Sequence, residues 1–271
     1  MNSEELKIRL HNGDPVLGSL ISSPSPFVPK WIAGCKMDFV FIDTEHIALD
    51  RTQVSWMCRT YGLMGIPPLV RIISPDPYLA TMVLDDGAAG VIAPYVESTE
   101  QVSALHGAVH FRPLKGRRLT DVLGGKALEP DLEKYLEQNN RGNILLTNIE
   151  SKPAMDNLDA LLDVGGIDSV LIGPHDLSCS LGIPEQYGHP DFLKAVETIL
   201  SRARSKGVGA GIHWWGSIDE HMRFINMGAN LIVHKADVIF FKDGINNELG
   251  ELRERLGIKG ADKGKEDSEA I

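Results

Sequence analysis

The sequence predicts an α/β fold of the (β/α)8 TIM-barrel class, in which eight parallel strands alternate with helices. The chain has 271 residues, 43% of them hydrophobic and 24% charged, a composition that suits one large domain with a sizeable core. Its short apolar runs are continuous rather than alternating, as is typical of parallel strands covered on both faces. Eight such runs are spaced along the chain: 16–21, 39–43, 68–72, 90–96, 144–150, 169–174, 209–214 and 230–235.

Helix signals separate these runs. Ser98 and Gln101 form a capping-box pattern at the start of one helix. The segments 155–164 and 191–207 carry apolar residues at helical spacing, and the second has its cations in the final turns, as a helix dipole favours. A doubly wound open sheet is the alternative, but that fold usually has a glycine-rich turn after its first strand. Residues 22–27, SSPSPF, contain no glycine, which favours the barrel.

Two segments fall outside the eightfold pattern. Residues 107–143 are too long for a simple crossover, and we expect them to form a lid or a subunit contact with a short helix over 131–138. Residues 259–271 are polar and are expected to be a disordered tail. The barrel domain, with a helix at its C-terminal end, is therefore expected to span residues 1–258.

The composition argues against several classes of function. A net charge of −10 disfavours nucleic-acid binding, which needs a clustered basic surface, although residues 112–118 are locally basic. The N-terminal segment is polar, and no apolar run approaches the roughly 20 residues that span a bilayer, so we expect no membrane contact and a cytoplasmic location. Cys35, Cys58 and Cys179 form no CxxC pair, and we expect all three to be reduced thiols in the core.

Polar residues follow most of the predicted strands. In a (β/α)8 barrel the C-terminal ends of the strands form one rim, and this rim holds the active site. Unpaired charge beside a buried strand is costly, so a bound cation or a charged substrate is the expected reason for a polar rim. The residues at these strand ends are Ser22, Ser23, Asp43, Glu45, His46, Arg71, Pro94, Asn148, Glu150, His175, Asp176, His213, His234 and Lys235.

Glu150 and Asp176 end neighbouring predicted strands, and neighbouring strands lie roughly 4.8 Å apart. Two carboxylates at that spacing predict a divalent metal site, and all-oxygen ligation suits Mg²⁺ or Mn²⁺. The alternative is that each acid caps the helix that follows it. We prefer the metal site because Asp43 and His46 are expected on the same rim.

Asp43 and His46 are three residues apart, a spacing that predicts a dyad in which the acid orients the imidazole for proton transfer. Arg71 ends the third strand, where a planar cation suits a carboxylate or an oxyanion; its alternative role is a salt bridge to Glu45 or Asp43. Residues 173–176 lie where a strand ends and a helix begins, and free backbone N–H groups there would bind an anion such as a substrate carboxylate.

These residues lie in blocks that resemble the HpcH/HpaI aldolase family, the metal-dependent class II pyruvate aldolases. The likeness runs from about Pro15 to about Ala236. It implies a (β/α)8 barrel that assembles as trimers or dimers of trimers, often with the C-terminal helix packed on a neighbouring subunit. The blocks that carry the resemblance are DFVFIDTEH, PPLVRI, LDDGAAGVIAPYVES, NIESKPAMDNLDALLDVGGID and, most specifically, IGPHDLSCSLGIP.

The resemblance implies a role for each rim residue that matches a family motif. Glu150 and Asp176 correspond to the metal ligands, His46 to the general base and Asp43 to its partner, while Arg71 corresponds to the cation that holds the keto-acid oxygen. The reaction implied is cleavage or formation of a 4-hydroxy-2-oxo acid through a pyruvate enolate. It implies a divalent cation, Mg²⁺ or Mn²⁺ with Co²⁺ as a third candidate, and as partners a keto acid of the pyruvate or oxaloacetate type and an aldehyde.

The resemblance also implies substrate contacts. Gly173, Pro174 and His175 match the start of the segment that receives the pyruvate carboxylate. Asn148 is a further substrate-binding candidate, standing where the family usually has the longer glutamine. Arg118 resembles the arginine of a family loop and is assigned to the lid.

Some positions depart from the family pattern. Leu119 stands where a glycine usually follows the loop arginine, so this loop is expected to take another path. Trp214 and Trp215 are bulkier than their counterparts. They are either core or interface aromatics, or the walls of a pocket for a bulky partner; Trp214 is kept as a substrate-binding candidate.

Three rival functions stay open. Lys235 at the eighth strand end suits a Schiff-base aldolase. The same enolate could also serve an oxaloacetate decarboxylase, or an enzyme that adds the enolate to an unsaturated ring as macrophomate synthase does, which the aromatic residues at 213–215 slightly favour. A non-catalytic scaffold is the third, and the charged rim argues against it. The sequence therefore predicts a metal-dependent carbon–carbon lyase that forms a homo-oligomer, a trimer or a hexamer.

Overall fold

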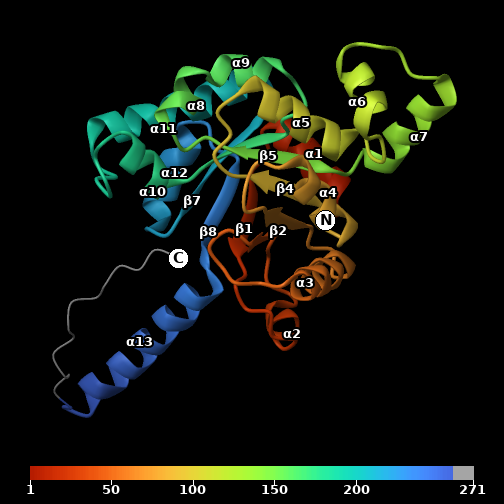
Figure 1. The fold of residues 1–271 in the computed structure, drawn as a ribbon. Helices are drawn as coiled ribbons and strands as arrows, with labels where there is room; N and C mark the ends of the chain where they lie inside the picture. Colours follow the sequence, from red (N-terminus) through yellow and green to blue (C-terminus); the bar gives the residue numbers. More distant parts are fainter. Residues whose placement is uncertain (259–271) are drawn as a thin grey trace.

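The computed structural model describes residues 1–258 as a closed barrel of eight parallel strands, which follow one another around the barrel in sequence order (Figure 1). Pairing of the first strand with the last closes the barrel. The strands are β1 Val16–Leu20, β2 Phe39–Asp43, β3 Pro68–Arg71, β4 Gly90–Ala93, β5 Ile144–Asn148, β6 Ser169–Ile172, β7 Gly209–Trp214 and β8 Leu231–Ala236. The predicted fold class is confirmed, while the expected tail at 259–271 lies outside the described residues.

Helices cover the outside of the barrel, and in the sequence at least one helix lies between each pair of successive strands (Figure 1). The predicted capping box at Ser98 and Gln101 is present at the start of α5. The single helix predicted over 155–164 is instead two short helices that meet at Asn157. The helices are α1 Ser3–Asn12, α2 Val28–Ile32, α3 Arg51–Leu63, α4 Pro77–Asp85, α5 Thr99–His110, α6 Gly116–Leu123, α7 Pro130–Asn140, α8 Lys152–Asp156, α9 Leu158–Asp163, α10 Pro174–Ser180, α11 Pro190–Ser205, α12 Ile218–Asn226 and α13 Asp237–Arg255.

Alternate residues of β2 to β6 enter two different hydrophobic clusters. In β2, Phe39 and Phe41 join other strand residues and Leu6 and Leu10 of α1 in one cluster. Val40 and Ile42 belong to the cluster shared with the surrounding helices. Because successive strand side chains point to opposite faces, the first cluster fills the barrel and the second joins the barrel to its helices. Both faces of the strands are thus apolar, which explains the continuous apolar runs in the sequence.

Two parts of the molecule extend beyond the barrel and its ring of helices. The insert places α6 and α7 next to α5, and α7 contains the short helix expected over 131–138 (Figure 1). At the C-terminal end, α13 projects away from the barrel, and none of its residues is buried (Figure 1). Phe241 and Leu249 are among the apolar residues that this helix exposes.

The cysteine prediction is only partly right. Cys58 of α3 is buried, whereas Cys35 and Cys179 are exposed, and all three are free. Burial raises the pKa of the Cys58 thiol to about 12, which keeps it protonated and unreactive. Within residues 1–258, no helix is both long and apolar enough to cross a membrane.

Candidate functional site

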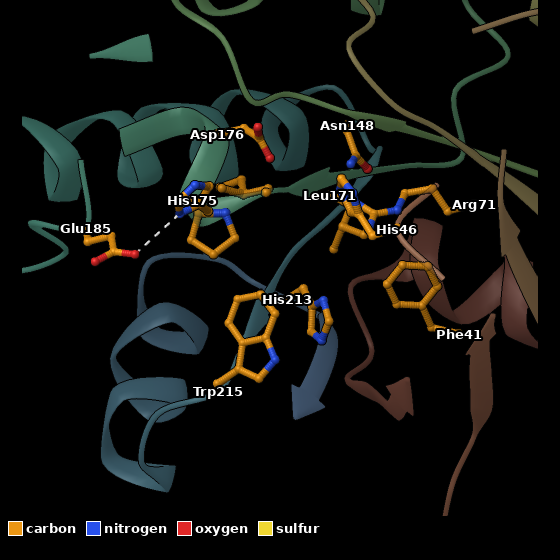
Figure 2. A pocket seen from close by; sticks show the side chains of 13 residues that line it. Phe41, His46, Arg71, Asn148, Leu171, His175, Asp176, Glu185, His213 and Trp215 are labelled. Carbon is orange, nitrogen blue, oxygen red and sulfur yellow. Dashed lines mark ion pairs between the residues drawn. The ribbon is translucent and has the colours of Figure 1, made fainter. Parts of the chain in front are cut away.

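A cavity of about 450 Å³ opens at the C-terminal ends of the strands (Figure 2). Asn148 and Asp176 lie on one side of it, and His213 and Trp215 lie on the other. The structure therefore brings most of the predicted site residues to one place, as expected for this rim of a barrel. The predicted residues that line the cavity are His46, Arg71, Asn148, Gly173, Pro174, His175 and Asp176.

Arg71 is fixed at the rim by acids of the neighbouring strand. It ends β3 directly opposite Asp43, the last residue of β2. Its Nε and Nη2 donate to the two carboxylate oxygens of Asp43 at 2.8 and 2.6 Å, and Nε lies 3.2 Å from Glu45 Oε2. Burial alone would raise the pKa of Asp43, but the hydrogen bonds and charge of Arg71 outweigh burial and lower it. The salt bridges considered as an alternative role are thus present, and they orient the guanidinium.

The predicted Asp43–His46 dyad does not form. Both oxygens of Asp43 accept from Arg71, and one also accepts from the backbone N–H of Glu45 at 3.0 Å. His46 instead lies with its Nε2 3.7 Å from Glu45 Oε2. The register of β2 and β3 explains the change, because it places the arginine where the imidazole was expected. His46 still lines the cavity, with about half of its side chain exposed.

Glu150 and Asp176 are joined through Tyr95, which follows β4. The backbone N–H of Tyr95 donates to Glu150 Oε1 at 2.9 Å, and its hydroxyl donates to Asp176 Oδ1 at 3.0 Å. Glu150 Oε2 accepts from Asn148 Nδ2 at 2.9 Å. Burial, together with the charge of Asp176, raises the pKa of Glu150 to about 7. Glu150 is 1% exposed, so its charged form is left without strong compensation at this rim.

Neither acid acts as a helix cap, which was the alternative role. The helix after Glu150 is capped by Ser151, whose side chain accepts from Ala154 N. The helix that contains Asp176 begins after Gly173 and has no side-chain cap, while Asp176 accepts from Tyr95. Helix capping therefore does not account for the presence of these two carboxylates at the rim.

The donor set at this rim fits a hard divalent cation. The described residues contain no group of three or more His, Cys, Asp or Glu side chains that converges as a metal site, so the protein would supply two carboxylates, those of Glu150 and Asp176. Small-molecule oxygens suit the remaining positions of Mg²⁺ or Mn²⁺. Asn148 supports this fit, because its Oδ1 is buried without a hydrogen-bond partner among the described residues. A buried acceptor left unpaired is costly, and a cation or its ligands would relieve that cost.

Tyr95 was missed in the sequence, although it contacts both acids. Its backbone is left-handed, with φ 46°, a conformation that a tyrosine rarely adopts. Burial and the charge of Asp176 raise the pKa of its hydroxyl, so the group stays a donor. The left-handed turn after β4 has no recognisable sequence pattern. The contacts of Tyr95 with Glu150, after β5, and with Asp176 of α10 join distant segments and have none either. The phenol at a strand end was the only available hint.

The two tryptophans after β7 take different places. Trp214 is 6% exposed, packs edge-on against Tyr187 and Phe224 and does not line the cavity, so its proposed contact with substrate does not fit the structure. Trp215 lines the cavity instead and lies over His213, with ring centroids 4.4 Å apart. Both expectations, core and pocket wall, thus hold for one residue each.

Two further candidates lie away from the cavity. Arg118 belongs to α6 in the insert, where it pairs with Glu129, and it does not line the cavity. Lys235 Nζ lies 2.6 Å from Asp243 of α13 and is likewise absent from the cavity wall. The structure therefore gives no support to a Schiff-base lysine at this position.

In this closed barrel the half-buried Asp176, an oriented arginine and a histidine line one cavity at the strand ends, and the buried Glu150 is linked to Asp176 through Tyr95. This is the architecture of a barrel enzyme. Residues 21–240 match the family model described as HpcH/HpaI aldolase/citrate lyase, and the chain belongs to this family. With its relatives it is a carbon–carbon lyase of the aldolase class.

Known proteins resemble the chain over nearly its whole length. It is 32% identical over 251 residues to the 2-keto-3-deoxy-L-rhamnonate aldolase of Escherichia coli (strain K12), covering 93% of this chain and 94% of the relative. The crystal structure of an HpcH/HpaI aldolase from Desulfitobacterium hafniense DCB-2 matches with a TM-score of 0.81 and 24% identity, covering 94% and 99%. That of macrophomate synthase matches with a TM-score of 0.75 and 23% identity, covering 95% and 91%. At these identities the two structures show the fold alone.

Proposed function

We propose that the protein cleaves or forms 4-hydroxy-2-oxo acids through a pyruvate-type enolate, with a divalent cation held by Glu150 and Asp176. Mg²⁺ and Mn²⁺ suit two carboxylates best, and Co²⁺ is a third candidate. One observation supports this most: Glu150 is buried beside Asp176, and its hydrogen-bond partners are an amide and a backbone N–H rather than a cation. A cation from outside the chain would balance this charge.

When bound, the cation would act as a Lewis acid on the keto acid. Arg71 would stabilise the negative charge that develops on the enolate oxygen. Its two pairs to Asp43 and its contact with Glu45 use Nε and Nη2, and among residues 1–258 its Nη1 makes no hydrogen bond. This nitrogen is therefore free to donate to the substrate oxygen. The bidentate pair holds the guanidinium in place before substrate arrives.

His46 is assigned the proton transfer at the C4 hydroxyl. In cleavage, the imidazole takes the hydroxyl proton, the C3–C4 bond breaks, and the aldehyde leaves while the electron pair forms the enolate. His46 lines the cavity and lies beside Glu45, whose carboxylate would stabilise the charged imidazolium. Addition of an aldehyde reverses these steps. The substrate carboxylate is assigned to the segment 173–176 at the start of α10.

The relatives suggest a class of substrate. A 2-keto-3-deoxy sugar acid has the keto-acid head and the C4 hydroxyl that the proposed chemistry needs. We therefore propose a 2-keto-3-deoxy acid, or the pyruvate and aldehyde from which it forms, as the substrate.

Decarboxylation of oxaloacetate, or addition of the enolate to an unsaturated ring, is a second candidate on the same centre. Trp215 over His213 supports it, because a flat aromatic wall suits a planar acceptor. Turnover of oxaloacetate in the absence of any aldehyde cleavage would favour this second function.

We further propose a homo-oligomer, a trimer or a hexamer. The support is α13, which carries exposed Phe241, Leu249 and Leu252 yet buries no residue within residues 1–258. Light scattering of the purified chain tests this, since a monomer at micromolar concentration would refute it.

The activity is tested by a cleavage screen of 4-hydroxy-2-oxo acids, with and without Mg²⁺, Mn²⁺ or Co²⁺, read by pyruvate release. We expect metal-dependent turnover that Glu150→Gln and Asp176→Asn abolish with the fold intact. Glu137→Gln is the matched control, because Glu137 is exposed on α7. Full activity in either site variant, or turnover that resists EDTA, would refute the assignment.

A further inference from the structure

The loop after α10 places an acid at the cavity that the proposed chemistry does not use. Glu185 lines the cavity together with His175 and Trp215 (Figure 2). Its Oε1 lies 3.8 Å from His175 Nδ1, and about half of its side chain is exposed. His175 is the residue before Asp176, so this ion pair flanks the proposed metal site on the side away from Arg71 (Figure 2).

Glu185 is held in a backbone conformation that disfavours a side chain. Its φ is 59°, and within residues 1–258 it is one of only three residues other than glycine with positive φ, beside Tyr95 and Lys235. Tyr95 contacts both acids of the proposed metal centre. Glycine adopts this conformation without steric cost, whereas a glutamate does not. A strained residue at a cavity points to a role for its side chain.

Hydrogen bonds to Ser178 tie this strained residue to α10. The backbone N–H of Glu185 donates to Ser178 Oγ at 3.0 Å, and the Ser178 hydroxyl donates to the carbonyl of His175 at 2.8 Å. Ser178 is fully buried. The backbone of Glu185 is thus anchored to the same helix that carries Asp176, so the fold rather than a free loop sets where its side chain starts.

The chemistry of this pair selects hydroxyl groups. A carboxylate accepts hydrogen bonds, and an imidazole beside it donates or accepts, whereas a hydroxyl can do both. An apolar or aromatic group against Glu185 would remove water from its charge without replacing the lost hydrogen bonds. On the other wall, Trp215 lines the cavity with its ring tilted against that of His213.

We propose that Glu185, with His175, binds hydroxyl groups of the aldehyde-derived part of the substrate and so sets a preference for hydroxylated over apolar aldehydes. This inference rests on the proposed function and specifies the acceptor class of that site. Glu185 is a specificity-determining residue, and it takes no part in breaking or forming the carbon–carbon bond.

The test compares lactaldehyde with propanal as acceptors for pyruvate, since the two aldehydes differ by one hydroxyl. We expect wild-type kcat/KM to favour lactaldehyde, and Glu185→Gln and Glu185→Gly to reduce that preference about tenfold, the loss expected for a hydrogen bond to a charged group. The kcat/KM for propanal should not fall and should rise where the apolar end no longer desolvates the carboxylate. Glu197→Gln, an exposed acid on α11, is the matched control and should keep the wild-type preference.

Glu185→Gly also separates specificity from folding. Because glycine tolerates this φ, the variant should unfold at the same temperature as the wild type or at a higher one. An unchanged preference in both variants, or an equal fall for both aldehydes, would overturn the inference while leaving the proposed aldolase intact. Absence of turnover with any aldehyde in the wild type would instead overturn the proposed function, and this inference with it.

Discussion

Two buried carboxylates on neighbouring strands, one at each end of the barrel, have opposite electrostatic environments. Asp168 precedes β6 at the N-terminal end, and Glu150 follows β5 at the C-terminal end. They are 3% and 1% exposed. The pKa of Asp168 is lowered, whereas the pKa of Glu150 is raised to about 7. Burial acts in the same upward direction on both, so the difference arises from their partners.

Asp168 is surrounded by the protein's own donors. It lies 2.9 Å from His11 Nε2, 3.2 Å from Lys7 Nζ and 3.4 Å from His110 Nε2, and it accepts from Leu145 N at 2.8 Å. Glu150 accepts from an amide and one backbone N–H, and the charge of Arg71, which lowers its pKa, does not outweigh burial and the charge of Asp176, which raise it. The charge of Asp168 is thus balanced within the fold, whereas the charge of Glu150, the proposed cation ligand, is less well balanced.

Removing the charge of Glu150 and removing that of Asp168 should therefore have different effects. The largest expected difference between the two variants is in catalytic activity. We expect Glu150→Gln to lower kcat on the order of a thousandfold or more, because the cation that the proposed chemistry needs loses a ligand. Asp168→Asn should keep kcat within about threefold of wild type, since the residue lies at the other end of the barrel. Pyruvate release under saturating Mn²⁺ measures both. An equal loss of kcat in the two variants would contradict a specific catalytic role for Glu150.

His46→Ala should be the next largest effect. Loss of a general base typically costs a factor of about 10² to 10⁴, so cleavage should slow by that amount. The affinity for Mn²⁺ should persist, because His46 is not among the proposed ligands. A variant that loses metal binding along with activity would assign His46 to the metal centre instead. Asp43→Asn can be compared with His46→Ala, because the main contact of Asp43 is with Arg71 and not with His46.

Stability should change in the opposite order. Asp168→Asn removes a buried carboxylate from its contacts with Lys7, His11 and His110, and we expect a loss of about 3 kcal/mol in the free energy of unfolding. Glu150→Gln should leave the metal-free protein equally stable or more stable, because it removes a poorly compensated buried charge. Urea denaturation in EDTA measures both values. A larger loss in Glu150→Gln than in Asp168→Asn would contradict the account.

The pH dependence follows from the same pKa shifts. The pKa of Glu150 is about 7 in the folded protein, against an ordinary value of 4.5 in the unfolded chain, so the folded protein binds more protons than the unfolded chain between these pH values. Stability of the metal-free protein should therefore fall as pH rises from about 4.5 to 7, by about 3 kcal/mol from this residue alone. The lowered pKa of Asp168 acts only in acid, where its contribution is lost as pH falls below 3.8. Saturating Mn²⁺ should remove this loss of stability near pH 7, and Glu150→Gln should not show it. A loss of stability that persists in Glu150→Gln would mean that another titrating group causes it.

Much of the fold was predictable because its signal is local. Apolar runs of strand length, covered on both faces, identified all eight strands, and the polar residues that follow them identified the rim. Because the strands are apolar on both faces, the direction in which each side chain points could not be predicted. Where both faces are apolar, the sequence does not show which alternate residues point inward, so Trp214 was expected at the cavity that Trp215 lines.

The remaining errors concern contacts between distant segments. The partner of Asp43 depends on the register of β2 with β3, which places Arg71 opposite it. Tyr95 reaches Glu150 and Asp176 only through a left-handed turn, and Glu185 reaches the cavity through the same kind of backbone. Left-handed φ values at residues other than glycine leave no pattern in a sequence, because glycine is the residue expected there.

Titration of Mn²⁺ into the metal-free protein, followed by electron paramagnetic resonance at pH 8, would show whether Glu150 and Asp176 hold a divalent cation. We expect one Mn²⁺ site per chain in the wild type and in Asp168→Asn, and loss of that site in both Glu150→Gln and Asp176→Asn. Unchanged Mn²⁺ affinity in the last two variants would contradict the proposed metal site.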